Sequence, residues 1–502
     1  MEYAFDWLKK WATYSPNNIA LQDAETGRSL SYLECYELSE RIAQSLKNEY
    51  QVKAGDRVAI LALNHIEYVV LFFAIRKIGA IMVPLNFRLT AHELDYMFGD
   101  CTPSLLLYED SFSATISKSE KAPAKKIQLD GPDGFLEKVK SSPEKITGSE
   151  DNSDEDATCM ILYTSGTTGH PKGAMITNKM LFWNSVNTGL RLNLTQNDVT
   201  LTFAPFFHTG GWNVLTTPFI HRGARLVLLR KFDADSILRL CDQENVSILF
   251  GVPTMMDMLA QSPEFKNCSL ESVRYAIVGG EPMPLPLIKT WHDKGVPIRQ
   301  GYGLTEFGPN VFSLNEEHAT SKIGSIGFPN FYIDAAVADD NGNLLGDNEA
   351  GELILRGPVC MKGYWNNPEA TSETIRNGWL HTGDIVKRDS EGFFYVVDRK
   401  KDMFISGAEN VYPAEVEHVL REHPHIREAA VIGVPHPKWG ETGKAFVVAA
   451  ESGNLTGQDV KEWCLDRLAK YKVPGHVKFI SELPKSDSGK VLKRQLKEDE
   501  AP

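Results

Sequence analysis

The sequence has no C-x-x-C pair, no long hydrophobic run and no excess of basic residues. Its seven cysteines are scattered and odd in number, a pattern typical of a reducing compartment and not of a structural zinc site. The most apolar stretch runs from Tyr68 to Ile75 and ends at Arg76, far short of the ~20 residues that cross a bilayer. We therefore expect no integral membrane segment, which leaves transient contact with a membrane open.

The N-terminus also lacks the features of an export signal. Residues 1–6 carry acidic side chains where a signal peptide has a basic lead followed by an apolar run. Together with the cysteine pattern, this absence predicts a cytoplasmic protein.

Acidic residues outnumber basic ones, with 66 Asp and Glu against 53 Lys and Arg and a net charge of −13. A protein that coats nucleic acid is expected to be basic, so the balance argues against that class and we expect no nucleic-acid partner. The excess lies in residues 1–397, because residues 398–502 carry 17 basic and 17 acidic side chains. At 42% apolar and 24% charged residues, the composition is typical of a globular protein.

Helical patterns alternate with short, continuously apolar strands along most of the chain. Residues 58–63 and 160–163 are two such strands, and this alternation predicts parallel sheets covered on both faces. Apolar density falls between residues 113 and 157, where we expect an exposed connector. From about Gly324 onward, β-rich segments with turn signals predict a smaller β subdomain.

The last hundred residues predict a separate small domain, preceded by the charged run Asp398-Arg399-Lys400-Lys401-Asp402. The predicted fold class is therefore α/β. A large N-terminal region, residues 1–397, comprises two α/β sheet subdomains and a small β subdomain. It is hinged to a small α/β C-terminal domain, residues 398–502.

The richest motif is Tyr-Thr-Ser-Gly-Thr-Thr-Gly-His-Pro-Lys-Gly at residues 163–173, directly after an apolar strand. Its hydroxyls, glycines and lysine describe a loop that can wrap a polyphosphate. It is not the P-loop, because His170 and Pro171 separate Gly169 from Lys172. Taken alone, the stretch is equally compatible with a flexible turn.

Three further loops have compatible chemistry. Residues 300–306, Gln-Gly-Tyr-Gly-Leu-Thr-Glu, offer a ring for a purine, a hydroxyl for phosphate and a carboxylate for Mg²⁺. Residues 378–384 place Asp384 in a glycine-flanked loop suited to ribose hydroxyls, and residues 484–490 deliver Lys490 from a turn-rich strip. Each segment alone is more often an ordinary loop, but four in fixed order favour a nucleotide-dependent enzyme.

These segments together resemble the adenylate-forming (AMP-binding) superfamily, which contains acyl-CoA synthetases, peptide-synthetase adenylation domains and beetle luciferases. The resemblance runs from residues 30–32 to Lys490. Within the superfamily the chain looks most like bacterial acyl-CoA synthetases of the fatty-acid-CoA ligase type. Phe-Phe-His at 206–208, the Gly-Gly-Glu-Pro loop at 279–282 and residues 405–415 carry that placement.

The resemblance implies a ligase that activates a carboxylic acid with Mg-ATP to acyl-AMP and pyrophosphate, then transfers the acyl group to coenzyme A. We expect a medium- or long-chain fatty acid and a role in fatty-acid and lipid metabolism. An aromatic-acid-CoA ligase is the alternative, and a luciferase-like or amino-acid-adenylating relative is also open. The implied cofactors are ATP, Mg²⁺ and coenzyme A as co-substrate, and the protein is expected to be a monomer or homodimer.

The resemblance also implies residue roles in ATP binding. Thr305 would touch the α-phosphate, Glu306 would hold Mg²⁺ and Tyr302 would stack on adenine. The full expected ATP-binding set is Thr164, Ser165, Gly166, Thr167, Thr168, Gly169, Lys172, Gly279, Gly280, Glu281, Pro282, Gly301, Tyr302, Gly303, Asp384 and Arg399.

In the same way, the resemblance implies that residues 1–397 are the AMP-binding domain and 398–502 a mobile lid with its hinge at Lys401. Lys490 would bridge the substrate carboxylate and the α-phosphate, and His208 would position the substrate. Gly407 and Ala408 would border the coenzyme A channel, where relatives usually have glycine in place of Ala408. The expected acyl pocket comprises Trp212, Phe250, Met255 and Gly308.

Overall fold

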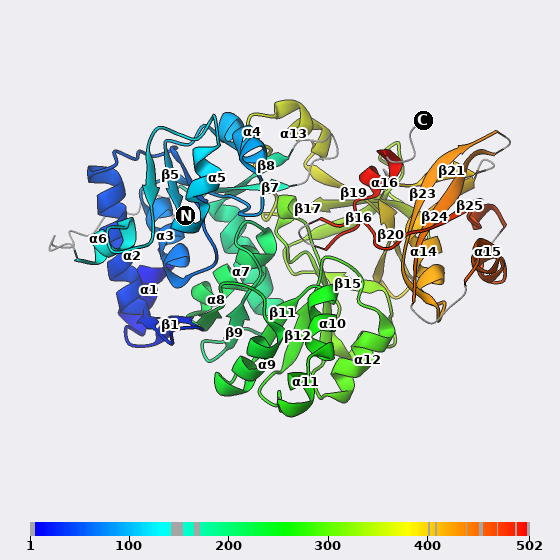
Figure 1. Cartoon of the computed structure of the whole chain (residues 1–502), viewed down its shortest axis with the longest axis horizontal. Helices are drawn as coiled ribbons and strands as arrows, with labels where there is room; N and C mark the ends of the chain where they lie inside the picture. Colours follow the sequence, from blue (N-terminus) through cyan, green and yellow to red (C-terminus); the bar gives the residue numbers. More distant parts are fainter. Residues whose placement is uncertain are drawn as a thin grey trace. The chain divides into compact units, whose positions relative to one another are not determined.

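The computed structural model describes residues 6–141, 154–164, 171–399, 402–406, 409–437, 439–450, 455–468, 470–486 and 489–498. The chain divides into two compact units, coloured along the sequence in Figure 1. The first contains Met1–Asp334 and Leu355–Leu380, and the second contains Ala335–Ile354 and His381–Pro502. The domain boundary expected at residue 398 stays a prediction. Within the described ranges, no helix is both long enough and apolar enough to span a bilayer.

The first sheet of unit one is buried on both faces. Its strands lie in the order β6 (Lys126–Gln128), β5 (Leu105–Tyr108), β3 (Arg57–Leu61), β4 (Ile81–Pro84), β7 (Thr158–Thr164) and β8 (Lys172–Thr177). Helices α2 (Tyr32–Asn48), α3 (Ile66–Lys77) and α4 (Ala91–Cys101) cover it. Successive side chains of a strand point to opposite faces, so Val58 and Ile60 join the core beneath α2 and α3, whereas Ala59 and Leu61 pack with α4.

The second sheet of unit one follows the same principle. Its strands lie in the order β15 (Ser325–Pro329), β14 (Phe312–Ser313), β13 (Ile298–Tyr302), β12 (Tyr275–Val278), β11 (Ile248–Gly251), β9 (Val199–Thr202), β10 (Arg225–Leu228), β1 (Ile19–Asp23) and β2 (Ser29–Ser31). Helices α9 (Ala234–Gln243), α10 (Pro253–Gln261) and α12 (Leu285–Asp293) lie together in Figure 1 and pack on one face. Helices α7 (Asn178–Arg191) and α8 (Thr216–Arg222) share the core of the other face.

Strands β11, β12 and β13 are parallel neighbours, so their carboxyl ends meet at one edge of the second sheet. Val278 at the end of β12 is the partner of Gln300 in β13. The predicted loops that start at Gly279 and Gly301 therefore leave the sheet side by side. This edge is where open α/β sheets generally bind their ligands.

Unit two contains the predicted β-rich segments and a small α/β layer. Strands β16 (Asp334–Ala338), β17 (Ala350–Arg356), β19 (Trp379–Arg388) and β20 (Phe394–Arg399) are neighbours in that order. The later strands lie in the order β22 (Glu409–Val411), β21 (Phe404–Ser406), β24 (Gly440–Ala449) and β23 (Ile426–His436), with β25 (His476–Phe479) also on β24. Helices α14 (Pro413–Arg421), α15 (Gly457–Leu465) and α16 (Lys493–Glu498) accompany them. The predicted α/β class is confirmed.

The expected connector between residues 113 and 157 is partly wrong. Strand β6 joins the first sheet, and α6 (Phe135–Ser141) places Phe135 in the core, where its ring centroid lies 5.6 Å from that of Tyr50. Leu136 and Val139 of the same helix are also buried, so the few apolar residues of this stretch are placed in the core. Further elements are α1 (Trp7–Tyr14), α5 (Ser113–Ser117), α11 (Glu264–Asn267), α13 (Pro368–Thr374), β18 (Ile375–Arg376) and short turns at Asp110–Phe112, Gly210–Val214, Thr305–Phe307, Glu316–His318 and Lys470–Lys472.

Candidate active site

The two ends of the predicted phosphate loop stand opposite each other on antiparallel strands. Thr164 ends β7, Lys172 begins β8, and the two are cross-strand partners. The Thr164 hydroxyl donates to the Lys172 carbonyl oxygen at 3.4 Å. The expected loop residues Ser165, Gly166, Thr167, Thr168 and Gly169 lie outside the described residues. The strand pair nevertheless fixes where that loop begins and ends.

Glu306 lies beside this loop although it follows Thr164 by 142 residues in the sequence. It sits in the short 3₁₀ turn Thr305–Phe307, directly after β13. The Thr164 hydroxyl is 3.5 Å from Glu306 Oε1, and the Tyr364 hydroxyl donates to the same oxygen at 2.9 Å. Lys172 Nζ lies 5.2 Å from the centroid of the Tyr364 ring. Three residues of the expected ATP and metal site, Thr164, Lys172 and Glu306, are thus brought together.

Tyr364 is a site residue that the sequence analysis missed. The residue is 8% exposed. Burial, followed by the charge and hydrogen bond of Glu306, raises the pKa of Tyr364 far above its usual value. Its hydroxyl therefore keeps its proton at neutral pH and can donate a hydrogen bond. The only sequence signal was an aromatic in the turn-rich stretch Gly-Tyr-Trp-Asn-Asn at residues 363–367.

The loops expected to bind adenine, at residues 279–282 and 301–303, lie at the same edge of the second sheet. A Cβ placed on Gly279 would lie 3.1 Å from the Gly301 carbonyl oxygen, so glycine permits this close approach of the two strands. Gly280 has a φ of +88°, in the left-handed region that glycine adopts readily. Glu281 and Pro282 are exposed, whereas Tyr302 is half-buried with its ring edge-on to Phe312. The two predicted motifs are therefore neighbours in space.

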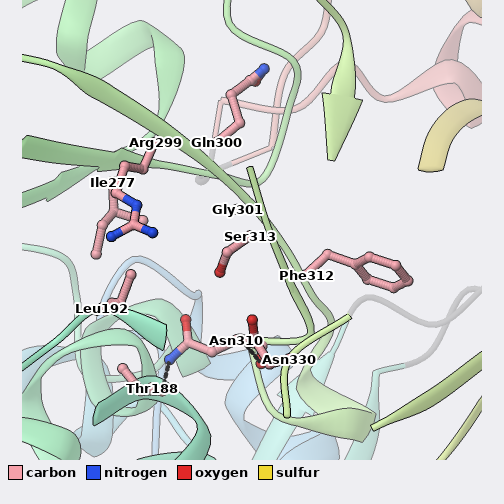
Figure 2. A pocket seen from close by; sticks show the side chains of 10 residues that line it. All are labelled: Thr188, Leu192, Ile277, Arg299, Gln300, Gly301, Asn310, Phe312, Ser313 and Asn330. Atoms are coloured by element: carbon pink, nitrogen blue, oxygen red, sulfur yellow. Dashed lines mark hydrogen bonds between the residues drawn. The ribbon is translucent and has the colours of Figure 1, made fainter. Parts of the chain in front are cut away.

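A small cavity lies behind this edge and is shown in Figure 2. Its volume is about 10 Å³, which corresponds to roughly one water molecule and is too small for a nucleotide or an acyl chain. Asn310 spans it, donating to the Thr188 hydroxyl at 2.6 Å, and Asn330 donates to the Asn310 carbonyl at 2.8 Å. The cavity belongs to the polar framework that joins α7 to the end of the sheet.

Two residues of the expected acyl pocket lie near the end of β11, Phe250 in the strand itself and Met255 in the first turn of α10. A Cβ on Gly210 would lie 3.5 Å from the Phe250 ring, and one on Gly251 would lie 3.6 Å from Met255 Cβ. Phe250 and Met255 are both half-buried. Gly210 of the Gly210–Val214 turn thus lies beside the Phe250 ring of β11.

The other expected substrate residues have different surroundings. Trp212 is 0% exposed and stacks on Phe206 at 4.3 Å between ring centroids, so it lies in the core. Gly308 is buried, and a Cβ there would lie 3.0 Å from Asn184 Oδ1. His208 is half-buried, with its ring 4.5 Å from that of Phe207. Their expected contacts with the acid stay predictions.

In unit two, the expected ribose ligands occur on paired strands. Asp384 in β19 is the cross-strand partner of Arg399 in β20, and Asp384 is only 3% exposed. Glu352 binds the strand next to Asp384, because its Oε1 accepts the Gly383 N–H at 3.1 Å. The side chain of Arg399 and the residues Lys401, Gly407 and Ala408 lie outside the described residues.

Lys490 is exposed on a narrow turn of unit two. The Ser486 N–H donates to the Lys490 carbonyl at 2.7 Å, and Gly489 has a φ of +84°. Nearby lysines are paired: Lys485 lies 2.5 Å from Glu428 and Lys493 lies 2.8 Å from Glu417. The turn therefore presents Lys490 to solvent while neighbouring positive charges are neutralised.

Comparisons with known proteins identify the family of the chain. Residues 8–365 match the model of the AMP-binding enzyme family, and residues 415–490 match that of the AMP-binding enzyme C-terminal domain. The chain is 40% identical to a feruloyl-CoA synthase of Amycolatopsis sp. over 491 residues, 98% of each chain. It is 37% identical to a long-chain-fatty-acid-CoA ligase of Mycobacterium tuberculosis over 501 residues, 98% of this chain and 97% of that one.

A solved structure extends the likeness to the fold. The O-succinylbenzoate coenzyme A synthetase of Bacillus subtilis, in complex with ATP and a magnesium ion, superposes with a TM-score of 0.88. The two sequences are 33% identical, and the match covers 98% of this chain and 99% of the other. The match over both regions, together with the clustering of Thr164, Lys172 and Glu306, confirms the predicted enzyme class. The chain belongs to the AMP-binding enzyme family, among the acyl-CoA ligases.

Proposed function

We propose that this protein joins a carboxylic acid to coenzyme A in two steps, consuming ATP and releasing AMP and pyrophosphate. The observation that carries the proposal is the meeting of Thr164, Lys172 and Glu306 at the mouth of the phosphate loop. A hydroxyl, an ammonium and a carboxylate at one point are the groups needed to hold a triphosphate and its cation.

The residues present fit a magnesium ion carried by ATP. Among the described residues there is no group of three or more His, Cys, Asp or Glu side chains that could hold a metal alone. Mg²⁺ is commonly bound by one or two carboxylates plus the phosphates of a substrate, and Glu306 offers one such carboxylate. When bound, the ion would offset phosphate charge and fix the orientation of the triphosphate.

In the first step, an oxygen of the substrate carboxylate attacks the α-phosphorus of ATP, and the bond to the β-phosphate breaks. Lys172 and the loop from residue 165 to 169 hold the departing pyrophosphate, and Thr305 contacts the α-phosphate. Lys490 supplies a compact positive charge between the two reacting anions. The products are the acyl adenylate and pyrophosphate.

In the second step, the sulfur of coenzyme A attacks the acyl carbonyl carbon, the thiol loses its proton to solvent, and AMP leaves. Asp384 and Arg399 hold the ribose throughout. Lys401 acts as the hinge that exchanges the Lys490 strip for the segment at Gly407 and Ala408. Positioning supplies most of the rate, because neither step needs a protein nucleophile.

For the acid, we propose a monocarboxylate with an apolar tail, taken up near Phe250 and Met255. A medium- or long-chain fatty acid fits the apolar side chains there, and the fatty-acid ligase relative supports it. The second candidate is an aromatic acid, favoured by the feruloyl-CoA synthase relative and by the absence of a side chain at Gly210, which lies beside the Phe250 ring.

The test is carboxylate-dependent exchange between ATP and labelled pyrophosphate across octanoate, hexadecanoate, ferulate, benzoate and 2-succinylbenzoate. We expect one class to support exchange at least tenfold above the acid-free rate. Exchange with the fatty acids alone selects the first candidate, and exchange with ferulate or benzoate alone selects the second. Exchange with none of them contradicts the proposed activity, and light emission or oxygen uptake would instead identify a luciferase-like oxygenase. Exchange with amino acids alone would identify an amino-acid-adenylating enzyme.

A further inference from the structure

We propose that Tyr364 is a positioning residue that orients the Glu306 carboxylate for the cation of Mg-ATP. This inference rests on the proposed function, since it concerns the same ATP site. The tyrosine lies 58 residues beyond Glu306 in the sequence and reaches it through its phenolic hydroxyl.

The segment of residues 361–365, here called the clip, is fixed to β8 by its backbone. Lys362 donates to Met175 at 3.1 Å, Met175 donates to Gly363 at 2.9 Å, and Trp365 donates to Gly173 at 2.7 Å. Because these bonds run along the strand that begins at Lys172, the clip cannot shift without disturbing the exit of the phosphate loop.

The clip also donates two hydrogen bonds to Glu306. The Met361 N–H donates to the Glu306 carbonyl oxygen at 2.9 Å, and the Tyr364 hydroxyl donates to Glu306 Oε1 at 2.9 Å. In the part of the chain that the structure describes, the recorded hydrogen bonds to this carboxylate both go to Oε1, the second being the longer one from Thr164. The carboxylate is thereby held in one rotation, with Oε2 the oxygen presented to a cation.

The ring of Tyr364 has a second contact that points to the same role. Lys172 Nζ lies 5.2 Å from the ring centroid, within the range in which an ammonium is attracted to an aromatic face. One buried side chain thus contacts both the cation-binding carboxylate and the phosphate-binding lysine. A tyrosine that merely filled the core would need neither contact.

The test compares Tyr364→Phe with Tyr32→Phe. Both variants keep the ring and lose a buried hydroxyl, but the Tyr32 hydroxyl donates to the Ala224 carbonyl and takes no part in the ATP site. We measure Mn²⁺-ATP binding by calorimetry, the Mg²⁺ dependence of exchange, and thermal unfolding. Loss of a hydrogen bond to a charged group predicts about tenfold weaker Mn²⁺-ATP binding, and a similar rise in the Mg²⁺ requirement, for Tyr364→Phe alone.

Measurements on the wild type and on a double variant distinguish a failure of the Tyr364 inference from a failure of the proposed function. Tyr364→Phe added to Glu306→Gln should weaken Mn²⁺-ATP binding no further than Glu306→Gln alone, because both changes remove the same interaction. Tyr364→Phe binding within twofold of wild type, or a fully additive effect in the double variant, overturns the inference. If the wild type binds Mn²⁺-ATP but exchanges with no acid, the proposed function fails while the binding comparison still decides the role of Tyr364.

Discussion

At the scale of single residues, the surroundings of Lys490 can be compared with those of the nearby Lys485 and Lys493. Lys485 and Lys493 form ion pairs with Glu428 and Glu417, and Lys490 is exposed where its carbonyl oxygen accepts the Ser486 N–H. Because the Lys490 side chain is exposed, an anionic substrate can approach it from solvent.

Lys490→Ala should therefore lose carboxylate-dependent ATP–pyrophosphate exchange by about 10²–10³-fold, because charge building between two anions is no longer offset. The variant should still convert supplied acyl-AMP and coenzyme A to the thioester. Lys485→Ala, on the same turn, is the control and should change exchange by less than about threefold, since it removes only a surface ion pair. Wild-type exchange by Lys490→Ala would remove this residue from the first step.

The sequence identified Thr164, Lys172 and Glu306 because hydroxyls, a lysine and an acid in glycine-rich loops have a chemical signature. Tyr364 has none: an isolated tyrosine in a turn is usually a packing residue, and only its contact with Glu306 gives it a role. Trp212 is the opposite case, a residue that the sequence suggested for the site and whose type suits two different roles. A tryptophan near a glycine pair suits a pocket as well as a core, and the structure places it against Phe206 in the core.

At the scale of elements, two glycines of the segment expected to bind adenine, Gly301 and Gly303, differ in the space around them. A Cβ on Gly303 would lie 2.1 Å from the Pro309 carbonyl oxygen, a collision with backbone that cannot move aside cheaply. A Cβ on Gly301 would meet nothing closer than Ile277 Cγ2 at 3.7 Å, an ordinary contact. The space at Gly301 is therefore available, whereas that at Gly303 is already filled.

Gly303→Ala should accordingly lower the free energy of unfolding by about 1–3 kcal/mol and weaken ATP binding. Gly301→Ala should stay within about 1 kcal/mol of wild type in stability. Urea unfolding of the two variants side by side measures the difference. Equal stabilities for the two would show that the approach of Pro309 to this loop is not as tight as described.

The covered parallel sheets were predictable because short strands such as residues 58–63 are apolar at every position, as a strand buried on both faces requires. The turn at Gly210–Val214 was not predictable in the same way. Its backbone forms a π-helical turn, and a Cβ on Gly211 would lie 2.3 Å from the Pro205 carbonyl oxygen. Glycine at 211 thus serves backbone packing, a reason that appears only when both segments are folded.

At the scale of the whole molecule, the negative charge of residues 1–397 is partly organised into buried ion pairs. Glu67 in α3 contacts Arg28 and lies 3.0 Å from Lys140 of α6. Burial would raise the pKa of Glu67, but the hydrogen bond and charge of His65 and the charges of Lys140 and Arg28 outweigh it and hold the pKa well below its usual range. These two ion pairs join three parts of the first unit that are distant in sequence.

A carboxyl whose pKa is lower in the folded than in the unfolded state stabilises the fold above its unfolded pKa, ~4.3, and less as the pH falls below that value. Glu67→Gln should therefore lower the free energy of unfolding at pH 7, measured by urea unfolding, by about 1–3 kcal/mol. Between pH 5 and pH 3, the variant should lose less stability than the wild type. Glu137→Gln, which removes the exposed partner of the same Lys140, is the control and should change little. If Glu67→Gln lost as much stability between pH 5 and pH 3 as the wild type does, Glu67 would not be the carboxyl responsible for that loss.

The central claim, an acyl-CoA ligase that forms AMP, is tested most directly by the stoichiometry of its products. Wild-type protein, Mg-ATP, coenzyme A and an acid selected by the exchange assay are mixed, and AMP, pyrophosphate and thioester are quantified together. The account predicts that the three form in equal amounts and that omitting the acid abolishes all of them. Formation of ADP and phosphate in place of AMP and pyrophosphate, or AMP release without thioester, would contradict it.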